Sequence, residues 1–154
     1  MSNCGLSLGF GDGPVSHAIG TPNPSNTDSV PFDPDAFLER CAAIDGATLG
    51  DGAFAAVRAL WVGRREVAHF DDERTLDVRL TKRVIREQRA QLRADERVAL
   101  RASASDWIEL RIENDHDADW AYSLVQRAVA ENLPSAPPGP PPTGGELERR
   151  RRFH

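Results

Sequence analysis

The stretch Trp61–Arg93, WVGRREVAHFDDERTLDVRLTKRVIREQRAQLR, decides the fold that the sequence predicts. Val67–Phe70 and Leu76–Leu80 have strand character, and the second alternates apolar with polar residues, which is the pattern of a half-buried strand. The polar residues 71–74 connect the two strands at the length of a hairpin loop. Because no glycine supplies a positive φ there, we expect a loop of four or five residues and not a two-residue turn.

A helix with a basic side is predicted to follow this hairpin. Thr81 is suited to cap its first turn, and Val84, Ile85 and Leu92 form its apolar side. Four basic residues recur at steps of four, three and four, which places them along one stripe roughly opposite the apolar side. These residues, called the basic stripe, are Lys82, Arg86, Arg89 and Arg93.

Upstream of the hairpin, we expect one helix and one further strand. Asp33 and Pro34 suit the cap and the first position of a helix that ends at Asp45 and Gly46. Residues 47–52 have the composition of a turn region. Residues 54–61 are predicted to be a strand, because Gly52 and Gly63 flank a segment that has the length of a strand. This strand would complete a three-stranded antiparallel meander with the two strands of the hairpin.

Downstream, residues 97–101 and 107–112 alternate like short strands, and Asn114 or Asp115 is suited to cap a final helix. The sequence therefore predicts the α+β class. We expect a small antiparallel sheet, made of the three-stranded meander plus one or two later strands, packed against three helices.

The domain organisation follows from length and composition. A chain of 154 residues is long enough for one domain with tails. Residues 1–31 are rich in Gly, Ser, Asn and Pro and are expected to form a disordered leader, followed by the α+β domain at 32–133. Residues 134–154 are expected to be a disordered proline-rich linker with a basic arginine tail. The net charge of −5 argues against a general polyanion binder.

The expected location is the cytoplasm. Cys4 and Cys41 are far apart in different kinds of segment, and both are interpreted as reduced thiols. The N-terminus lacks the basic region and apolar run of a secretory signal. No stretch approaches the roughly 20 apolar residues that cross a bilayer, so no membrane partner is expected.

Three motifs carry a resemblance to a known family: GRREVAHF from Gly63, LDVRLTKRVIRE from Leu76 and SDWIELRI from Ser105. With these motifs, the chain resembles the luciferase-domain family of small bacterial and archaeal proteins, over about residues 33–133. The strongest matches are Gly63, Arg64, Glu66, Ala68, His69, Leu76, Thr81 and Trp107. The resemblance implies an uncharacterised protein, with no catalytic residues to carry over. Many members have a second histidine or a glycine in the hairpin where this chain has residues 71–74, so a histidine pair is not expected here.

His69, Asp77 and Arg79 are the candidate catalytic residues, because they fall on adjacent predicted strands. A histidine beside a carboxylate is a plausible general base. The alternative is a hydrogen-bond cluster on the sheet that fixes strand register, and spacing alone does not decide between them. His69 is also close in sequence to Asp71 and Asp72, but the repeated spacing of metal ligands is missing. No metal and no cofactor are therefore expected.

The basic stripe and Trp107 are the candidate binding residues. The stripe would suit phosphates or an acidic partner, whereas a solvated helix face explains the same spacing. Trp107 would border a groove or pack in the core.

Three functions stay open at this stage. The first is a small cytoplasmic binding or interaction module of unknown biochemical role, recognised by an exposed apolar patch. The second is an enzyme that uses His69 and Asp77 in a pocket on the sheet. The third is weak nucleic-acid binding through a flat, positive helix face and the arginine tail. The sequence specifies neither the ligand, the reaction, the partner nor the oligomeric state.

Overall fold

The computed structural model of the chain describes residues 31–54, 57–102 and 104–152. The predicted leader at 1–31 lies outside this part except for Pro31, as do residues 153–154 of the predicted tail. The elements in chain order are α1 (Pro34–Ala42), β1 (Ala47–Asp51), β2 (Arg58–Val62), β3 (Arg65–Phe70), β4 (Thr75–Arg79), α2 (Lys82–Glu87), α3 (Arg89–Ala94), β5 (Val98–Leu100), β6 (Trp107–Arg111), α4 (Asp115–Asn132), the 3-10 helix η1 (Leu133–Ser135) and α5 (Gly145–Arg152).

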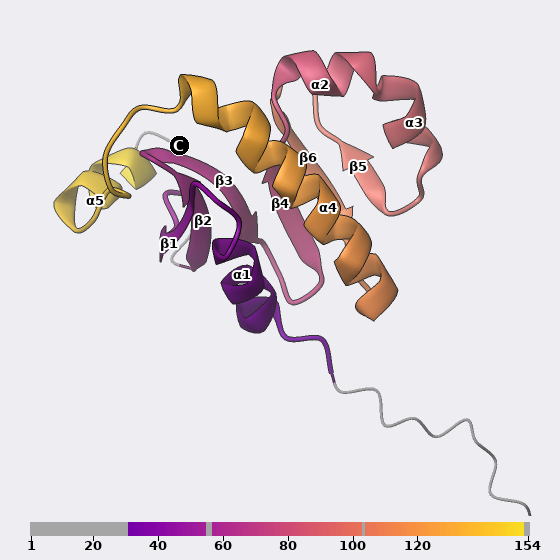
Figure 1. The fold of residues 1–154 in the computed structure, drawn as a ribbon, viewed down its shortest axis with the longest axis horizontal. Helices are drawn as coiled ribbons and strands as arrows, with labels where there is room; N and C mark the ends of the chain where they lie inside the picture. Colours follow the sequence, from indigo (N-terminus) through magenta and orange to yellow (C-terminus); the bar gives the residue numbers. More distant parts are fainter. Residues whose placement is uncertain (1–30, 55–56, 103, 153–154) are drawn as a thin grey trace, which may run out of the picture. The chain divides into compact units, whose positions relative to one another are not determined.

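The strands form one antiparallel sheet in the order β1-β2-β3-β4-β6-β5, so the predicted α+β class is confirmed. Helices α1 and α4 pack on the same face of this sheet, with α4 crossing over β3 and β4 (Figure 1). The main core lies between them and includes Leu60, Ala68, Val78 and Ile108, which stand side by side on successive strands. Because strand residues alternate between faces, the neighbours of these four, apart from Val67, point to the opposite face.

A bulge in the β2–β3 pair changes which residues reach that opposite face. Leu60 stands opposite Ala68, but the next residue, Trp61, stands opposite Glu66. Val67 is therefore one extra residue in β3, as in a β-bulge. In a regular strand, residues three apart point to opposite faces. The bulge instead brings Glu66 onto the same face as His69.

Helix capping follows the sequence closely. The Asp33 side chain accepts hydrogen bonds from the backbone N–H groups at the start of α1, and Asn114 caps α4 in the same way. Thr81 accepts from the N–H of Val84, so its predicted capping role is also confirmed. The helix that it opens is shorter than expected. The chain leaves helical geometry at Gln88, and the predicted single helix is instead two, α2 and α3, that meet at an angle (Figure 1).

The prediction of a turn at residues 47–52 is wrong, because Ala47–Asp51 is strand β1. This edge strand pairs with β2 along its whole length. Its small residues have a packing role: a Cβ atom added at Gly50 would lie only 3.2 Å from the indole of Trp61. The sequence of β1 therefore lacks the apolar alternation by which strands are recognised.

The expected disorder of residues 134–154 differs from the structure, in which residues 145–152 form helix α5. Leu147 of this helix is 3% exposed and packs on Trp61, on the face of the sheet opposite α1 and α4. The proline-rich segment before it is also attached, since the carbonyl oxygen of Pro137 accepts a 2.9 Å hydrogen bond from the N–H of Arg64. A single buried leucine among charged residues gives no helical periodicity, which explains why the sequence does not predict this element.

Candidate functional site

A cluster of charged side chains is buried on the sheet face that α5 partly covers. His69 of β3 stands directly opposite Asp77 of β4. Its Nε2 atom lies 3.3 Å from Oδ2 of Asp77, and its Nδ1 atom lies 2.7 Å from Oε1 of Glu66. The exposed fractions are 6% for His69 and 2% for each acid, so all three are shielded from solvent. Both ring nitrogens of the histidine therefore face carboxylates.

These carboxylates determine the protonation state of His69. Burial lowers the pKa of the imidazole, but the contacts with Asp77 and Glu66 outweigh burial and raise the pKa to about 9. The side chain is therefore an imidazolium at neutral pH. This is the opposite of the neutral histidine that a general base requires.

The two acids differ in the hydrogen bonds of the carboxylate oxygen that does not face His69. Oε2 of Glu66 accepts a 2.5 Å hydrogen bond from the backbone N–H of Ala53. Oδ2 of Asp77, already beside His69, also accepts a 2.6 Å hydrogen bond from Arg101, which in turn pairs with Glu109. Oδ1 of Asp77 is buried and has no hydrogen-bond partner within the described residues.

Two aromatic rings enclose the histidine. Phe54 stacks on the imidazole at a centroid distance of 6.0 Å, and Trp107 meets it edge-on at 5.5 Å. The two rings also contact each other, at 5.6 Å. Arg79 completes this wall, with its guanidinium carbon 5.3 Å from the centre of the Trp107 ring and its Nε donating to Asp106 at 2.7 Å.

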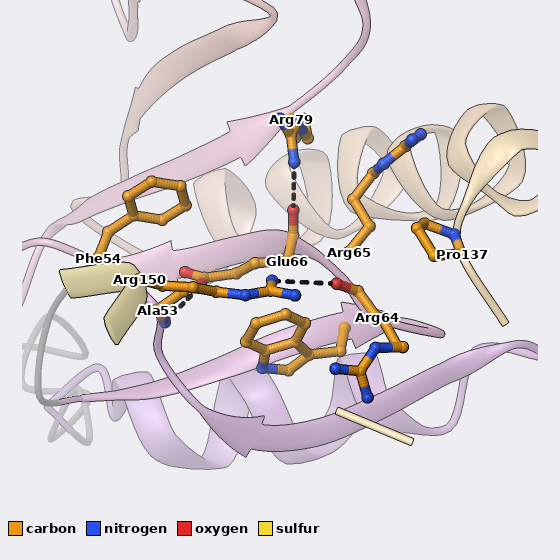
Figure 2. A pocket seen from close by; sticks show the side chains of 9 residues that line it. Ala53, Phe54, Arg64, Arg65, Glu66, Arg79, Pro137 and Arg150 are labelled. Carbon is orange, nitrogen blue, oxygen red and sulfur yellow. Dashed lines mark hydrogen bonds between the residues drawn. The ribbon is translucent and has the colours of Figure 1, made fainter. Parts of the chain in front are cut away.

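A cavity of about 510 Å³ lies over this cluster and is called the His69 pocket. It is lined by Phe54, His69, Asp71, Asp77, Arg79, Arg101, Asp106 and Trp107. A second cavity of about 370 Å³ shares Phe54 and Arg79 with it and is called the arginine pocket (Figure 2). Its lining is Ala53, Phe54, Trp61, Arg64, Arg65, Glu66, Arg79, Pro137 and Arg150. The two cavities therefore adjoin on the same face of the sheet.

The structure brings together four of the residues that the sequence singles out. His69, Asp77, Arg79 and Trp107 all line the His69 pocket. Trp107 has both of the roles considered for it, because it is 9% exposed and also borders the cavity.

The basic stripe is not part of this site. The break at Gln88 divides it, with Lys82 and Arg86 on α2 and Arg89 and Arg93 on α3. The stripe therefore does not form one continuous helix face. None of its four side chains has an ion-pair partner in the part of the chain that the structure describes.

Three residues of the site were not predicted: Glu66, Phe54 and Arg101. Glu66 is three positions from His69, a spacing that reaches the same face only because of the bulge. Phe54 reaches the site from the loop before β2, and Arg101 follows β5, which is separated from β3 by two other strands of the sheet. The only sequence signal was the match of Glu66 to the luciferase-domain motif GRREVAHF.

Within the residues that the structure describes, no group of three or more His, Cys, Asp or Glu side chains is arranged to hold a metal ion. None of the helices in this part of the chain has the length and hydropathy of a membrane span.

Comparison with known proteins supports the resemblance seen in the motifs. No curated protein and no solved structure matches the chain significantly. The luciferase-domain family model does match, over residues 64–128, a segment that contains β3, β4, β6 and most of α4. This segment carries Glu66, His69, Asp77 and Trp107. The core of the candidate site thus lies within the part of the chain that matches the luciferase domain.

Proposed function

We propose that the protein binds a small organic molecule in the His69 pocket, through a hydrogen bond from a ligand N–H or O–H group to Oδ1 of Asp77. That oxygen is the observation that carries the proposal. It is buried, it belongs to a residue that lines the cavity, and it has no partner in the described residues. Buried polar atoms almost always have hydrogen-bond partners, so an unpaired carboxylate oxygen beside a cavity is suited to a ligand donor.

The neighbouring charges hold this carboxylate in place. His69 and Arg101 both contact Oδ2 of Asp77, which leaves Oδ1 as the oxygen of this carboxylate without a partner in the described residues. Glu66 fixes the other side of the imidazole ring. His69 is therefore a positioning residue, since neither of its nitrogens is available to a ligand.

The aromatic walls favour a flat ligand. Phe54 and Trp107 meet at about a right angle, with 82° between their planes, and thus offer a ring face beside a ring edge. Aromatic rings prefer these offset and edge-to-face arrangements. The volume of about 510 Å³ lies in the range of small-molecule sites, which is roughly 300–1,000 Å³.

An enzyme is the second candidate, and the same atom supports it. A carboxylate oxygen that accepts a hydrogen bond from a ligand is also placed to accept its proton. In this version Asp77 replaces His69 as the proton acceptor. Chemical change of a bound ligand that stops in the Asp77→Asn variant would distinguish the enzyme from the binding protein.

The binding proposal is tested with pairs of planar compounds that differ only in the donor, such as 4-methylphenol and 4-methylanisole. Ligand-observed NMR and calorimetry would compare their affinities for the full chain. We expect the phenol to bind at least about tenfold more tightly, as one hydrogen bond to a charged group is worth about 1.5–3 kcal/mol.

The matched variants are Asp77→Asn and Asp45→Asn. His69 and Arg101 require an acceptor at the position of Oδ2, so the new amide would place its NH₂ group where Oδ1 was. Preference for the phenol should be lost in Asp77→Asn and kept in Asp45→Asn, which changes an exposed aspartate outside the pocket. Equal binding of both compounds by the wild type, or an unchanged preference in Asp77→Asn, would contradict the proposal.

A further inference from the structure

Four arginines from three parts of the chain line the arginine pocket. Arg65 begins β3 and Arg64 directly precedes it, Arg79 ends β4, and Arg150 comes from α5. Figure 2 shows the Arg150 side chain extending into this cavity, where its guanidinium donates a 3.4 Å hydrogen bond to the carbonyl oxygen of Arg64. In a chain with a net charge of −5, this is a marked local concentration of positive charge.

The carboxylates around the cavity do not balance these cations. Glu146 is shared by Arg64 and Arg150, and Asp106 pairs with Arg79. Arg65 donates only to uncharged acceptors, the side chains of Asn132 and Ser135 and the carbonyl oxygen of Ser135. The Arg65 guanidinium therefore points toward α4 and η1, and two carboxylates face the three guanidinium groups of Arg64, Arg79 and Arg150.

Glu66 does not supply the missing charge. Its side chain is 2% exposed, and its two oxygens already face the His69 imidazolium and the N–H of Ala53. An anion that entered the cavity would therefore find positive charge without a competing free carboxylate.

Free donors accompany the excess charge. A guanidinium carries five N–H groups in a planar fork that matches the oxygens of carboxylates and phosphates. Arg79 uses Nε for Asp106 and one terminal nitrogen for the carbonyl oxygen of Glu66, and no partner is found within the described residues for its other terminal nitrogen. Arg79 also lines the His69 pocket, so one residue borders both cavities.

We propose that the arginine pocket binds the anionic group, a carboxylate or phosphate, of the same ligand whose planar part occupies the His69 pocket. This inference rests on the proposed function and names its ligand class: a flat molecule with one hydrogen-bond donor and one oxyanion. Arg79 and Arg150 hold the oxyanion, and Asp77 accepts from the donor. The C-terminal segment thereby belongs to the binding site, because α5 supplies Arg150.

A purely structural role for these arginines makes a different prediction. Arg64 and Arg150 both contact Glu146 and so help to attach α5. If attachment were their whole role, replacing Arg150 would lower stability without changing any preference for anions. The experiment must therefore measure selectivity between an anion and its neutral analogue as well as folding.

The first measurement uses 4-hydroxyphenylacetate and 4-hydroxyphenylacetamide, which share the phenol and differ in charge. Calorimetry on the full chain should show the carboxylate binding at least about tenfold more tightly than the amide, the size of effect given by one charge-assisted contact. Arg150→Gln should reduce this preference to about threefold or less. Arg149→Gln, an exposed arginine of the same helix outside the cavity, should keep it.

The second measurement uses inorganic phosphate alone and does not depend on the His69 pocket. Phosphate should raise the melting temperature of the wild type and of Arg149→Gln above that in chloride at equal ionic strength, and it should raise that of Arg150→Gln less. A response to phosphate but not to the carboxylate would assign the site to phosphorylated ligands.

The two proposals fail in different ways. Equal affinity for the acetate and the acetamide, together with an equal phosphate response in all three proteins, would overturn the anion site and leave a phenol preference over the anisole intact. Loss of that phenol preference with a retained phosphate response would overturn the Asp77 contact instead. An Arg150→Gln protein that binds the acetate as the wild type does would also overturn the role of α5.

Discussion

The stability of the domain should fall as the pH rises past the pKa of His69. Contacts with Asp77 and Glu66 overcome the effect of burial and raise this pKa from 6.5 to about 9 in the folded protein. Each unit of difference between the folded and unfolded states corresponds to about 1.4 kcal/mol, so the charged histidine contributes roughly 3 kcal/mol. Because the folded pKa is the higher one, this contribution is complete below about pH 6.5 and is lost as the pH rises through about 9.

Urea unfolding of the wild type and of His69→Gln would measure the effect, at several values from about pH 6 to about pH 9.5. Glutamine keeps a polar side chain but cannot carry the charge. The difference in the free energy of unfolding between the two proteins should be largest near pH 6. It should shrink by about 3 kcal/mol toward the alkaline end, because the wild type alone loses its imidazolium.

NMR provides an independent check on the same group. The imidazole resonance that disappears in His69→Gln belongs to His69, and its chemical shift in the wild type should titrate near pH 9. A midpoint close to the ordinary value of about 6.5 would refute the reasoning. So would a stability difference that does not change with pH, since the carboxylates would then have no preference for the charged form.

Three further predictions concern the surroundings of the site. Trp107→Ala should lower the free energy of unfolding by about 3 kcal/mol, because it empties a largely buried aromatic site; a loss below about 1 kcal/mol in urea unfolding would contradict this. Leu147→Ala should cost about 2–3 kcal/mol and make α5 sensitive to proteases, whereas unchanged stability would mean that α5 does not pack on Trp61. Changing Arg86 and Arg93 together to Gln should leave the affinity for the pocket ligand unaltered. If the wild type bound nucleic acid tightly and the double variant did not, the basic stripe would be a functional surface after all.

The parts of the fold that the sequence predicts are those with local signals. The hairpin of β3 and β4 was predicted because alternation and loop length are visible within 15 residues, and the helix caps because Asp33, Thr81 and Asn114 act on the next few N–H groups. Strand β1 is held by backbone pairing with β2 and has small side chains, so its sequence resembles a turn. Helix α5 is attached through Leu147, which packs on Trp61 about 90 residues away, and through the ion pair of Glu146 with Arg64, so no local sequence pattern indicates it.

The residues of the candidate site also divide into those with a local sequence signal and those without one. Pairing of His69 with Asp77 follows from the hairpin, since strands joined by a short loop have a fixed register. Glu66 was missed because in a regular strand it would point away from the face of His69, and only the bulge brings it onto that face. The contact of Arg101 with Asp77 joins segments from different strands, and the arginine pocket needs a helix that the sequence did not predict.

A cluster that only fixed strand register would not need the arrangement seen around Asp77. His69 opposite Asp77 would suffice for register, and an apolar pair at those positions would be at least as stable, because buried charges lose much of their attraction to desolvation. The structure instead surrounds the histidine with two carboxylates and leaves Oδ1 of Asp77 buried without a partner in the described residues, at a cost of about 1–3 kcal/mol. Nothing in the sheet offsets this loss of stability. A hydrogen bond from a ligand donor in the adjoining cavity would offset it, so the unpaired oxygen favours a binding site over a structural cluster.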